Sequence, residues 1–344
     1  MDLQLGLFPD DPALSPDHVE AAEVPSELAS VAARLSRRVR LGTSSWTFPG
    51  WHRLVYDREA PQKVLSQRGL AAYARHPLLN TVGVDRTYYR PISEREYRAY
   101  AHDVPGSFRF LVKADRLVTS PHQPEGYGVR QPNPYFLDPS YASEEVVGPM
   151  VEGLGRKAGP LLFQFSPMPP AMVGGTGAFL ERLHRFLDAL PKGPLYAVEL
   201  RTPAFLNATY AELIDGLDVA HCYNVHPTMT PIDEQLRVVS AFYQPALVVR
   251  WMLHGSFQYE VAKERYAPFD RLVDEDPTSR ESIARAVIDA LVAERQAFVI
   301  ANNKAEGSAP LSVFRLAEHI VNWAPPTGAT STDDPDPMGA YGAS

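Results

Sequence analysis

The chain has 344 residues, 45% of them hydrophobic, and carries a formal net charge of −8 at pH 7. This acidic balance argues against the dense basic surface of a nonspecific nucleic-acid binder, although a local basic cleft is compatible with it. The single cysteine, Cys222, excludes an intrachain disulfide framework, and its place inside an apolar run predicts a buried, unreactive thiol. No apolar run approaches the ~20 residues that span a bilayer, and the acidic N-terminus is unlike a secretory signal. We therefore expect a cytoplasmic protein without a membrane partner.

Both ends of the chain are predicted to lie outside the main domain. Residues 1–25 are rich in proline and acidic residues, which favours a flexible segment. Residues 26–38 predict a short helix with Ser26 as its N-cap, so that 1–38 form an N-terminal extension. Residues 325–344 have no periodic apolar face and predict a disordered tail.

Between these ends, eight short apolar runs alternate with stretches of helical spacing. The runs cover residues 39–45, 80–84, 108–112, 160–165, 195–200, 218–224, 246–251 and 297–301. Strand followed by helix, repeated eight times, is typical of a closed parallel barrel. We therefore predict an α/β fold, a (β/α)8 TIM barrel, as a single domain over residues 39–324. In that fold the active site lies at the carboxyl ends of the strands.

Local signals place helix starts and two long loops. Ser93 with Glu96, and Thr278 with Glu281, have the spacing of capping boxes. Residues 114–142 and 252–278 follow the third and seventh runs, and the first of these segments is rich in Pro, Gly and Tyr. Long irregular loops within a compact domain often bind ligands or act as lids. Both loops would lie at the carboxyl-end face.

A series of short segments then resembles one known family. GTSSW at 42–46 is followed by NTVGVDRTYYR at 80–90, FRFLVKADRLVT at 108–119, AVELRTPAF at 197–205 and ANNKAEGSAP at 301–310. Together they resemble the DUF72 family over about residues 41–320. The resemblance implies a TIM barrel with a site at the strand ends, but it implies no particular reaction.

The chain also departs from the family pattern. In the second strand, Gly83 and Asp85 stand where the family usually has Glu and Asn. If the family's Glu is catalytic, Gly83 implies an altered or lost activity. The loop over 122–142 also looks larger than is usual in the family.

Charged residues at the ends of the predicted strands are the candidates for catalysis. Glu199 and Arg201 are two residues apart, so strand alternation places them on one face, as an acid–base group with an anion clamp or as a structural ion pair. Lys113 ends the third strand, either as a base or electrophile or as an ion partner of Glu199 or Asp85. Asp85, after the second strand, is a further catalytic candidate, as a base, a metal ligand or the partner of Lys113. His254, after the seventh strand, is either a general acid–base group or a loop hydrogen-bonder.

Several further residues are candidates for substrate binding. Arg250 offers a planar fork for phosphate or carboxylate near the seventh and eighth strands, where such barrels often bind phosphate. Aromatic and amide side chains at the same face suit sugars or bases, although packing and loop capping explain them equally well. The full predicted binding set is Arg201, Arg250, Tyr89, Arg90, Trp46, Asn302 and Asn303.

The sequence does not identify a cofactor. Asp85, Glu199, His122, His226 and His254 could together bind a divalent metal ion, but their spacing matches no known local motif. We find none of the short sequence patterns that mark zinc, P-loop or dinucleotide sites. A divalent metal ion therefore stays open as a cofactor.

Three classes of function follow from these residues. The first is an enzyme, a hydrolase, lyase or isomerase, acting on a small anionic substrate that is phosphorylated or sugar-like. The second is nucleic-acid binding or metal-dependent phosphodiester hydrolysis, by analogy with barrel-fold endonucleases. The third is a ligand-binding protein without turnover. The helix exteriors carry no extra apolar stripe from which an oligomeric state could be inferred.

Overall fold

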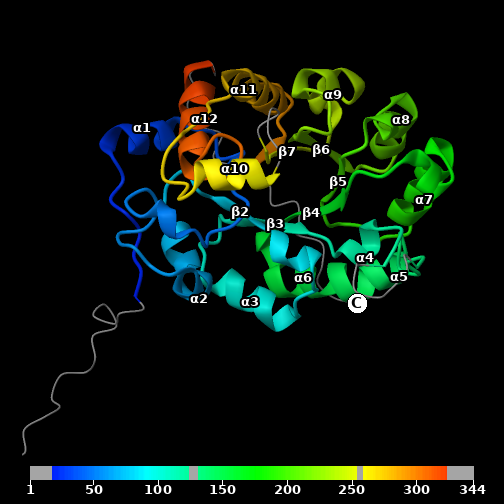
Figure 1. Cartoon of the computed structure of the whole chain (residues 1–344), viewed down its shortest axis with the longest axis horizontal. Coiled ribbons are helices and arrows are strands. Elements are labelled where there is room, and N and C mark those ends of the chain that lie inside the picture. Colours follow the sequence, from blue (N-terminus) through cyan, green and yellow to red (C-terminus); the bar gives the residue numbers. More distant parts are fainter. Residues whose placement is uncertain (1–17, 124–130, 254–258, 324–344) are drawn as a thin grey trace, which may run out of the picture.

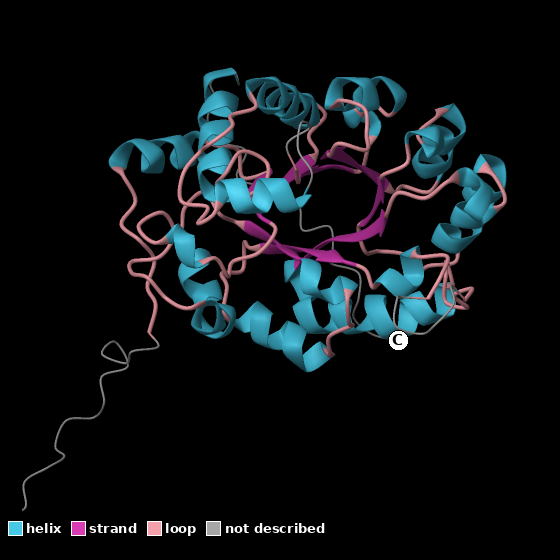
Figure 2. Ribbon diagram, viewed as in Figure 1, coloured by secondary structure: helices cyan, strands magenta, loops and turns pink. Residues whose placement is uncertain are grey.

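Eight parallel strands close into a barrel at the centre of the molecule (Figures 1 and 2). The computed structural model describes residues 18–123, 131–253 and 259–323. Each strand pairs with the next, and β8 closes the barrel against β1. The strands are β1 Val39–Thr43, β2 Thr81–Val84, β3 Arg109–Lys113, β4 Ala158–Phe165, β5 Tyr196–Leu200, β6 Ala220–Val225, β7 Ala246–Trp251 and β8 Gln296–Ala301. Each coincides with a predicted run, and the (β/α)8 prediction is confirmed.

Helices surround the strands as an outer ring (Figure 2). They are α1 Ser26–Arg34, α2 Gln62–Tyr73, α3 Glu94–His102, α4 Arg116–Thr119, α5 Pro139–Tyr141, α6 Gly148–Leu154, α7 Thr176–Asp188, α8 Ala208–Gly216, α9 Ile232–Val238, α10 Tyr259–Tyr266, α11 Pro277–Val292 and α12 Ala309–Trp323. Within the described ranges, no helix is both long enough and apolar enough to cross a membrane.

The interior of the barrel changes from apolar to polar along the strand direction. The inward-facing side chains farther from the carboxyl ends of the strands are apolar and fully buried: Leu111, Leu162, Ala197, Ala220, Cys222, Val248 and Ile300. Side chains two residues apart on a strand share a face. The next inward positions are therefore those of Lys113, Gln164, Glu199, Asn224, Arg250 and Asn302. We call this polar, carboxyl-end opening of the barrel the barrel mouth.

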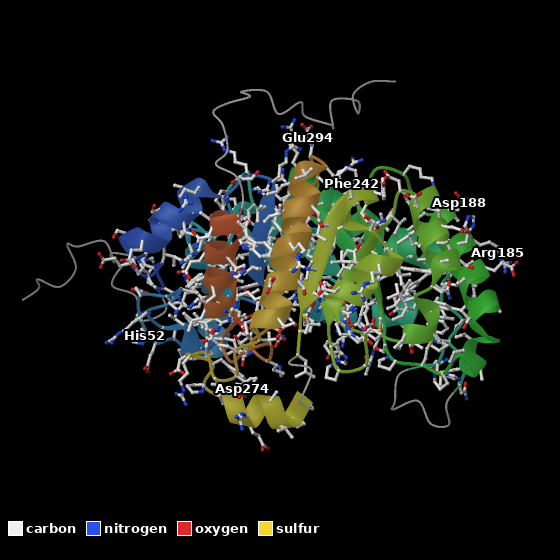
Figure 3. All side chains as sticks on the ribbon, turned by 90° about the horizontal axis from the view of Figure 1, so that it is seen from above. His52, Arg185, Asp188, Phe242, Asp274 and Glu294 are labelled. Carbon is white, nitrogen blue, oxygen red and sulfur yellow. The ribbon has the colours of Figure 1, made fainter. Side chains whose placement is uncertain are left out.

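The two ends of the barrel are separated clearly in Figure 3. Glu294 and Phe242 precede β8 and β7 and lie at one end, whereas His52 and Asp274 follow β1 and β7 and lie at the other. Helix α10 also lies at the second end, within the long segment after β7 that the sequence predicted as a loop.

Close approach of neighbouring strands explains one glycine of the barrel. A Cβ atom on Gly42 of β1 would lie 1.9 Å from the carbonyl oxygen of Thr81 on β2, far inside any real contact distance. Gly83, on the inner face of β2, is less constrained, because its Cβ would approach the Cα of Ser44 to 3.2 Å. A larger side chain at position 83 therefore requires a small shift of the chain around Ser44.

The helix starts confirm one predicted capping box and correct the other. The capping box of Ser93 and Glu96 is confirmed at the start of α3. Helix α11 instead begins at Pro277, because the side chain of Asp276 accepts a hydrogen bond from the backbone amide of Ser279, so the prediction of Thr278 as N-cap is wrong. Proline at the first helical position has a preset φ that favours this earlier start.

Helix α1 is present but shorter than predicted. It ends at Arg34 rather than at residue 38, because Leu35 adopts an extended backbone conformation. Its N-cap is Pro25, so the prediction that Ser26 caps the helix is wrong. Residues 1–17, the predicted tail 325–344 and part of the 122–142 loop lie outside the described residues.

Candidate functional site

Four charged side chains from three strand ends form a continuous ion-pair chain at the barrel mouth. Arg201 Nε donates to Glu199 Oε1 and Arg250 Nη1 donates to Glu199 Oε2, each at 2.7 Å. Arg250 Nη2 also donates to Asp85 Oδ2 at 2.8 Å. Glu199 is 0% exposed and Arg250 is 1% exposed. The two-residue spacing of Glu199 and Arg201 thus gives the shared orientation that the sequence predicts.

This chain of contacts fixes the charge state of Glu199. Burial by itself raises the pKa of its carboxyl group, but the neighbouring charges of Arg201, Arg250 and Lys113 outweigh burial and hold the pKa at about 2. Burial likewise opposes the charge on Arg250, and the attraction of Asp85 and Glu199 raises its pKa in spite of burial. Both groups are therefore firmly ionised at neutral pH.

The fork of Arg250 is occupied by protein groups rather than open to a ligand. Its two terminal nitrogens bond the carboxylates of Glu199 and Asp85. The pair of Glu199 and Arg250 is fully buried, so removing either partner leaves an unpaired buried charge, whereas the side chain of Asp85 is 31% exposed. Arg201 is more exposed than Arg250, at 14% of its side chain, and lies nearer the solvent.

Lys113 is buried at the same opening but makes a different contact. Its Nζ lies 3.5 Å from the centre of the Tyr88 ring, a cation–π arrangement. Burial lowers the pKa of the ammonium from 10.5 to about 8, an effect that Asp85 opposes and Arg250 strengthens. Among the described residues, no carboxylate forms a salt bridge with Lys113, and Arg250 bonds one oxygen of Asp85 and one of Glu199.

Five charged residues therefore define what we call the mouth cluster: Asp85, Lys113, Glu199, Arg201 and Arg250. It holds three cations and two carboxylates, which leaves one positive charge uncompensated within the set. Unpaired charge is costly in a buried environment. An anionic group bound at the opening would neutralise this excess.

The remaining predicted binding residues occupy three different environments. Asn302 Nδ2 donates to Ser44 Oγ at 2.8 Å beside the opening. The side chain of Asn303 is buried, and its Oδ1 accepts from Trp51 Nε1 at 3.1 Å and from the backbone amide of Ala309 at 2.8 Å. Asn303 is thus a structural support at the start of α12.

Trp46 and Trp51, the two tryptophans that follow β1, are packed inside the fold. Trp46 is buried, with its ring edge-on to Tyr100 at a centroid distance of 5.2 Å, and Trp51 is fully buried against Phe48. These contacts match the packing role that the sequence left open for Trp46. They leave little indole surface for stacking on a ligand.

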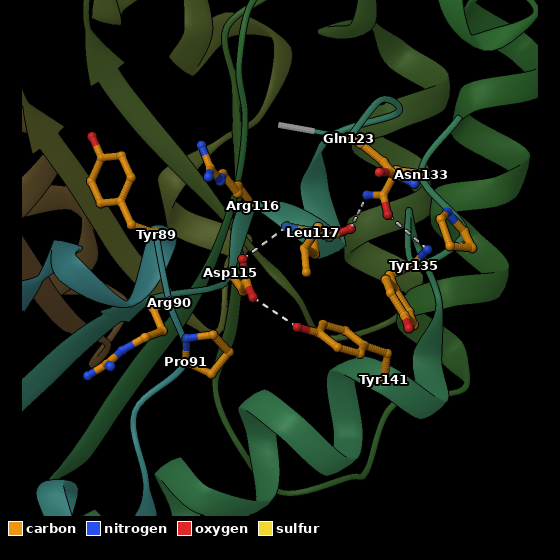
Figure 4. Close-up of a pocket in the computed structure, with 11 residues that line it drawn as sticks. Tyr89, Arg90, Pro91, Asp115, Arg116, Leu117, Gln123, Asn133, Tyr135 and Tyr141 are labelled. Carbon is orange, nitrogen blue, oxygen red and sulfur yellow. Dashed lines mark hydrogen bonds between the residues drawn. The ribbon is translucent and has the colours of Figure 1, made fainter. Parts of the chain in front are cut away.

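Tyr89 and Arg90 line a separate pocket of about 370 Å³ next to the barrel mouth (Figure 4). The opposite side of this pocket is formed by the segment after β3, including Asp115, Tyr135 and Tyr141. Sequence reasoning did not select these three residues. The only signal for them was the unusual length and tyrosine content of that loop.

The residues of the suggested metal set are not brought together by the described part of the chain. His122 pairs with Pro132 in an isolated bridge, and Asp85 and Glu199 bond Arg250. Within the described ranges, no group of three or more His, Cys, Asp or Glu side chains could hold a metal ion. His254, a predicted catalytic residue, lies outside the described residues.

His226, by contrast, lies close to the mouth cluster. Its Nδ1 is 2.8 Å from Thr228 Oγ1. Burial and then the charge of Arg201 lower the pKa of its imidazole to about 4. His226 is therefore neutral at physiological pH and can exchange hydrogen bonds with a ligand.

Comparison with known proteins places the chain in a family. A search of curated proteins gave no match. A DUF72 family protein of Enterococcus faecalis V583 shares 19% identity, with a TM-score of 0.54, over 86% of this chain and 100% of its own. A DUF72 family protein of Thermotoga maritima MSB8 shares 18% identity, also with a TM-score of 0.54, over 82% of this chain and 98% of its own. The model of the family described as "Protein of unknown function DUF72" matches residues 40–334, and the chain therefore belongs to the DUF72 family.

Proposed function

We propose that this protein is an enzyme that acts on a small anionic substrate bound at the barrel mouth. One observation carries this proposal: the mouth cluster holds an uncompensated positive charge, and the buried ammonium of Lys113 rests on Tyr88 instead of a carboxylate. Charges fixed in a site with little water bind and polarise an anion more strongly than they would in solution. A phosphate or carboxylate group of the substrate fits this requirement.

The contacts suggest a role for each member of the cluster. Glu199 and Asp85 position the two guanidinium groups, since their oxygens already accept hydrogen bonds from Arg201 and Arg250. Lys113 and Arg201 are the cations that face the ligand. The sequence favoured Glu199 for proton transfer, but a carboxyl group with a pKa of about 2 is a weak base.

Lys113 is better suited to move a proton. Its pKa of about 8 lies near neutral pH, where a general acid or base is most effective. In the protonated form it also neutralises charge that develops on the substrate. We therefore assign proton transfer to Lys113, with His226 as a neutral hydrogen-bonding neighbour.

The first test measures anion binding by titration calorimetry with inorganic phosphate and glycerol 3-phosphate. Lys113→Met and Arg201→Met each remove one ligand-facing cation. A hydrogen bond to a charged group contributes about 1.5–3 kcal/mol, so we expect each variant to bind about 10- to 100-fold more weakly. Lys192→Met is the control, because Lys192 pairs with Asp188 at the exposed end of α7. Equal affinity of all four proteins for both anions would contradict the proposal.

The second test separates catalysis from binding. Each phosphorylated compound that binds is incubated with the wild type and with Lys113→Met, and the products are followed by phosphorus NMR. Conversion by the wild type that is lost in Lys113→Met supports an enzyme with Lys113 in the proton-transfer role. A ligand that binds through Lys113 and Arg201 but is never converted would make the protein a binding protein instead.

A further inference from the structure

The proposed function uses the mouth cluster and leaves the pocket lined by Tyr89 and Arg90 without a role. We call it the side pocket, and the lining residues that matter here are Tyr89, Arg90, Arg116, Asn133, Tyr135 and Tyr141. In Figure 4, Tyr89 and Tyr135 lie on either side of Asp115 and Arg116. Its volume of about 370 Å³ is at the small end of the range for ligand pockets, which suits a single ring rather than an extended molecule.

The neighbouring rings of Tyr88 and Tyr89 connect the mouth cluster to the side pocket. The Lys113 ammonium lies over the face of Tyr88, at 3.5 Å from the ring centre. Tyr89 lies edge-on to Tyr88, with a centroid distance of 5.3 Å, and the Arg116 guanidinium is 5.9 Å from the centre of the Tyr89 ring. A small ligand with its charged group at Lys113 can therefore place its other end against Tyr89.

Hydrogen bonds within the long loop hold the side pocket in shape. The buried carboxylate of Asp115 accepts from the backbone amide of Leu117 at 3.0 Å and from the Tyr141 hydroxyl at 2.9 Å (Figure 4). The buried amide of Asn133 donates to the Leu117 carbonyl and accepts from the backbone amide of Tyr135 at 3.0 Å. A pocket fixed in this way loses little conformational freedom when a ligand binds.

The aromatic rings of this rigid pocket remain open to solvent. Tyr89 is 70% exposed and Tyr135 is 44% exposed, although both carry large apolar surfaces. The lining also includes Arg90 and Arg116, whose guanidinium groups carry several hydrogen-bond donors. In Figure 4 the guanidinium of Arg116 points toward Tyr89, whereas that of Arg90 points away from Tyr135 and Tyr141. Ring faces beside planar donors provide complementary contacts for a ring that is apolar on its face and polar at its edge.

We propose that the side pocket binds the ring of a monosaccharide, so that the substrate of the mouth cluster is an acidic or phosphorylated sugar; the identity of the substrate rests on the function proposed above. A pyranose presents C–H groups on its face to tyrosine and hydroxyl groups at its edge to arginine. A nucleobase can stack on one of these rings, but the ring pairs do not lie parallel to enclose it on both faces. Tyr88 and Tyr89 instead meet at 85°, and Tyr135 and Tyr141 are tilted by 33° and contact each other.

The test measures binding of four probes by calorimetry: inorganic phosphate, a mixture of hexose 6-phosphates, methyl glucoside and AMP. The variant Tyr89→Ala removes one ring, and Tyr89→Phe restores it without the hydroxyl. Tyr243→Ala is the matched control, since Tyr243 is also 70% exposed but precedes β7 at the opposite end of the barrel. Both positions are exposed, so these variants should fold.

We expect the wild type to bind a hexose phosphate at least tenfold more tightly than inorganic phosphate. Tyr89→Ala should lose about tenfold in affinity for the sugar phosphate and nothing for inorganic phosphate, whereas Tyr89→Phe and Tyr243→Ala should match the wild type. Lys113→Met should weaken both probes.

Three results would overturn the sugar site. In the first, the wild type binds sugar phosphate no more tightly than inorganic phosphate. In the second, Tyr89→Ala and Tyr243→Ala lose the same affinity for sugar phosphate. In the third, the protein binds AMP more tightly than sugar phosphate, and this preference depends on Tyr89. The last would assign the pocket to a nucleobase. Failure of the proposed function has a different signature: methyl glucoside would bind in a Tyr89-dependent manner, while inorganic phosphate would not bind and Lys113→Met would change nothing.

Discussion

The replacement of Glu199 by glutamine removes one charge from the mouth cluster while keeping the shape of the side chain. In the wild type, both carboxylate oxygens accept hydrogen bonds of 2.7 Å from Arg201 and Arg250, and Glu199 is 0% exposed. The variant leaves Asp85 as the one carboxylate of the mouth cluster. Breaking a buried ion pair from one side costs about 3–5 kcal/mol.

A second route gives a similar magnitude. Arginine charges hold the pKa of Glu199 at about 2 against its usual 4.5, and each pKa unit corresponds to 1.36 kcal/mol. The shift therefore represents about 3 kcal/mol of folding stability at neutral pH. Because the folded-state pKa is the lower one, this stability is complete above pH 4.5 and is lost as the pH falls toward 2.

Urea unfolding at pH 7 measures the loss of unfolding free energy in Glu199→Gln directly. The thermal unfolding midpoint of the variant should lie about 6–10 °C below that of the wild type, at about 2 °C per kcal/mol. The difference between wild type and variant should be constant from pH 5 to 7 and should shrink below pH 4.5. Glu281→Gln is the control, because it removes an exposed pair with Arg285 and should cost less than about 1 kcal/mol. A loss below 1 kcal/mol in Glu199→Gln, or a difference independent of pH, would refute the reasoning.

Three further predictions concern the charge of Lys113, the strand contact at Gly42 and the thiol of Cys222. Because Lys113 loses its proton at a pKa of about 8, phosphate affinity should fall as the pH rises from 7 to 9 in the wild type but not in Lys113→Met, as measured by calorimetry. Gly42→Ala should cost more than about 2 kcal/mol in urea unfolding, since its Cβ would overlap Thr81, whereas Gly106→Ala, with open space around it, should stay within about 1 kcal/mol. Burial raises the pKa of Cys222, so a thiol reagent should label it only after unfolding; rapid labelling of the native protein would contradict its buried position.

The barrel itself could be predicted because its signal is local. Each strand is a short apolar run, and the repeat of run and helix fixes the closed arrangement without knowledge of any single contact. Strand alternation also placed Glu199 and Arg201 on one face, and their 2.7 Å hydrogen bond confirms this. Helix ends at Asp276 and Leu35 were less predictable, because several nearby residues could have ended the same apolar pattern.

The partners within the site depend on contacts between distant segments. The sequence offered Asp85 or Glu199 as the ion partner of Lys113, but Arg250, on a different strand, bonds both carboxylates. Lys113 instead lies over the ring of Tyr88, which follows the second strand. Competition among charges that meet only in the closed barrel cannot be read from spacing along the chain.

The side pocket was predictable only as a long loop. Its shape comes from side chain–backbone hydrogen bonds of Asp115 and Asn133, and such bonds leave no periodic pattern in the sequence. Tyr89 and Arg90 were selected as binding residues, but the opposite wall with Tyr135 was not.

The ion-pair chain from Asp85 through Arg250 and Glu199 to Arg201 joins side chains that follow or end β2, β7 and β5. Each member is tolerated inside the barrel because its neighbours are present. A single substitution at any of these positions is therefore expected to be harmful, even where two or three simultaneous substitutions would be neutral. Within the family, these four positions should therefore change together over evolutionary time. A DUF72 barrel can reach a different charge pattern at its mouth only if each substitution of one charged residue is accompanied by a substitution of its partner.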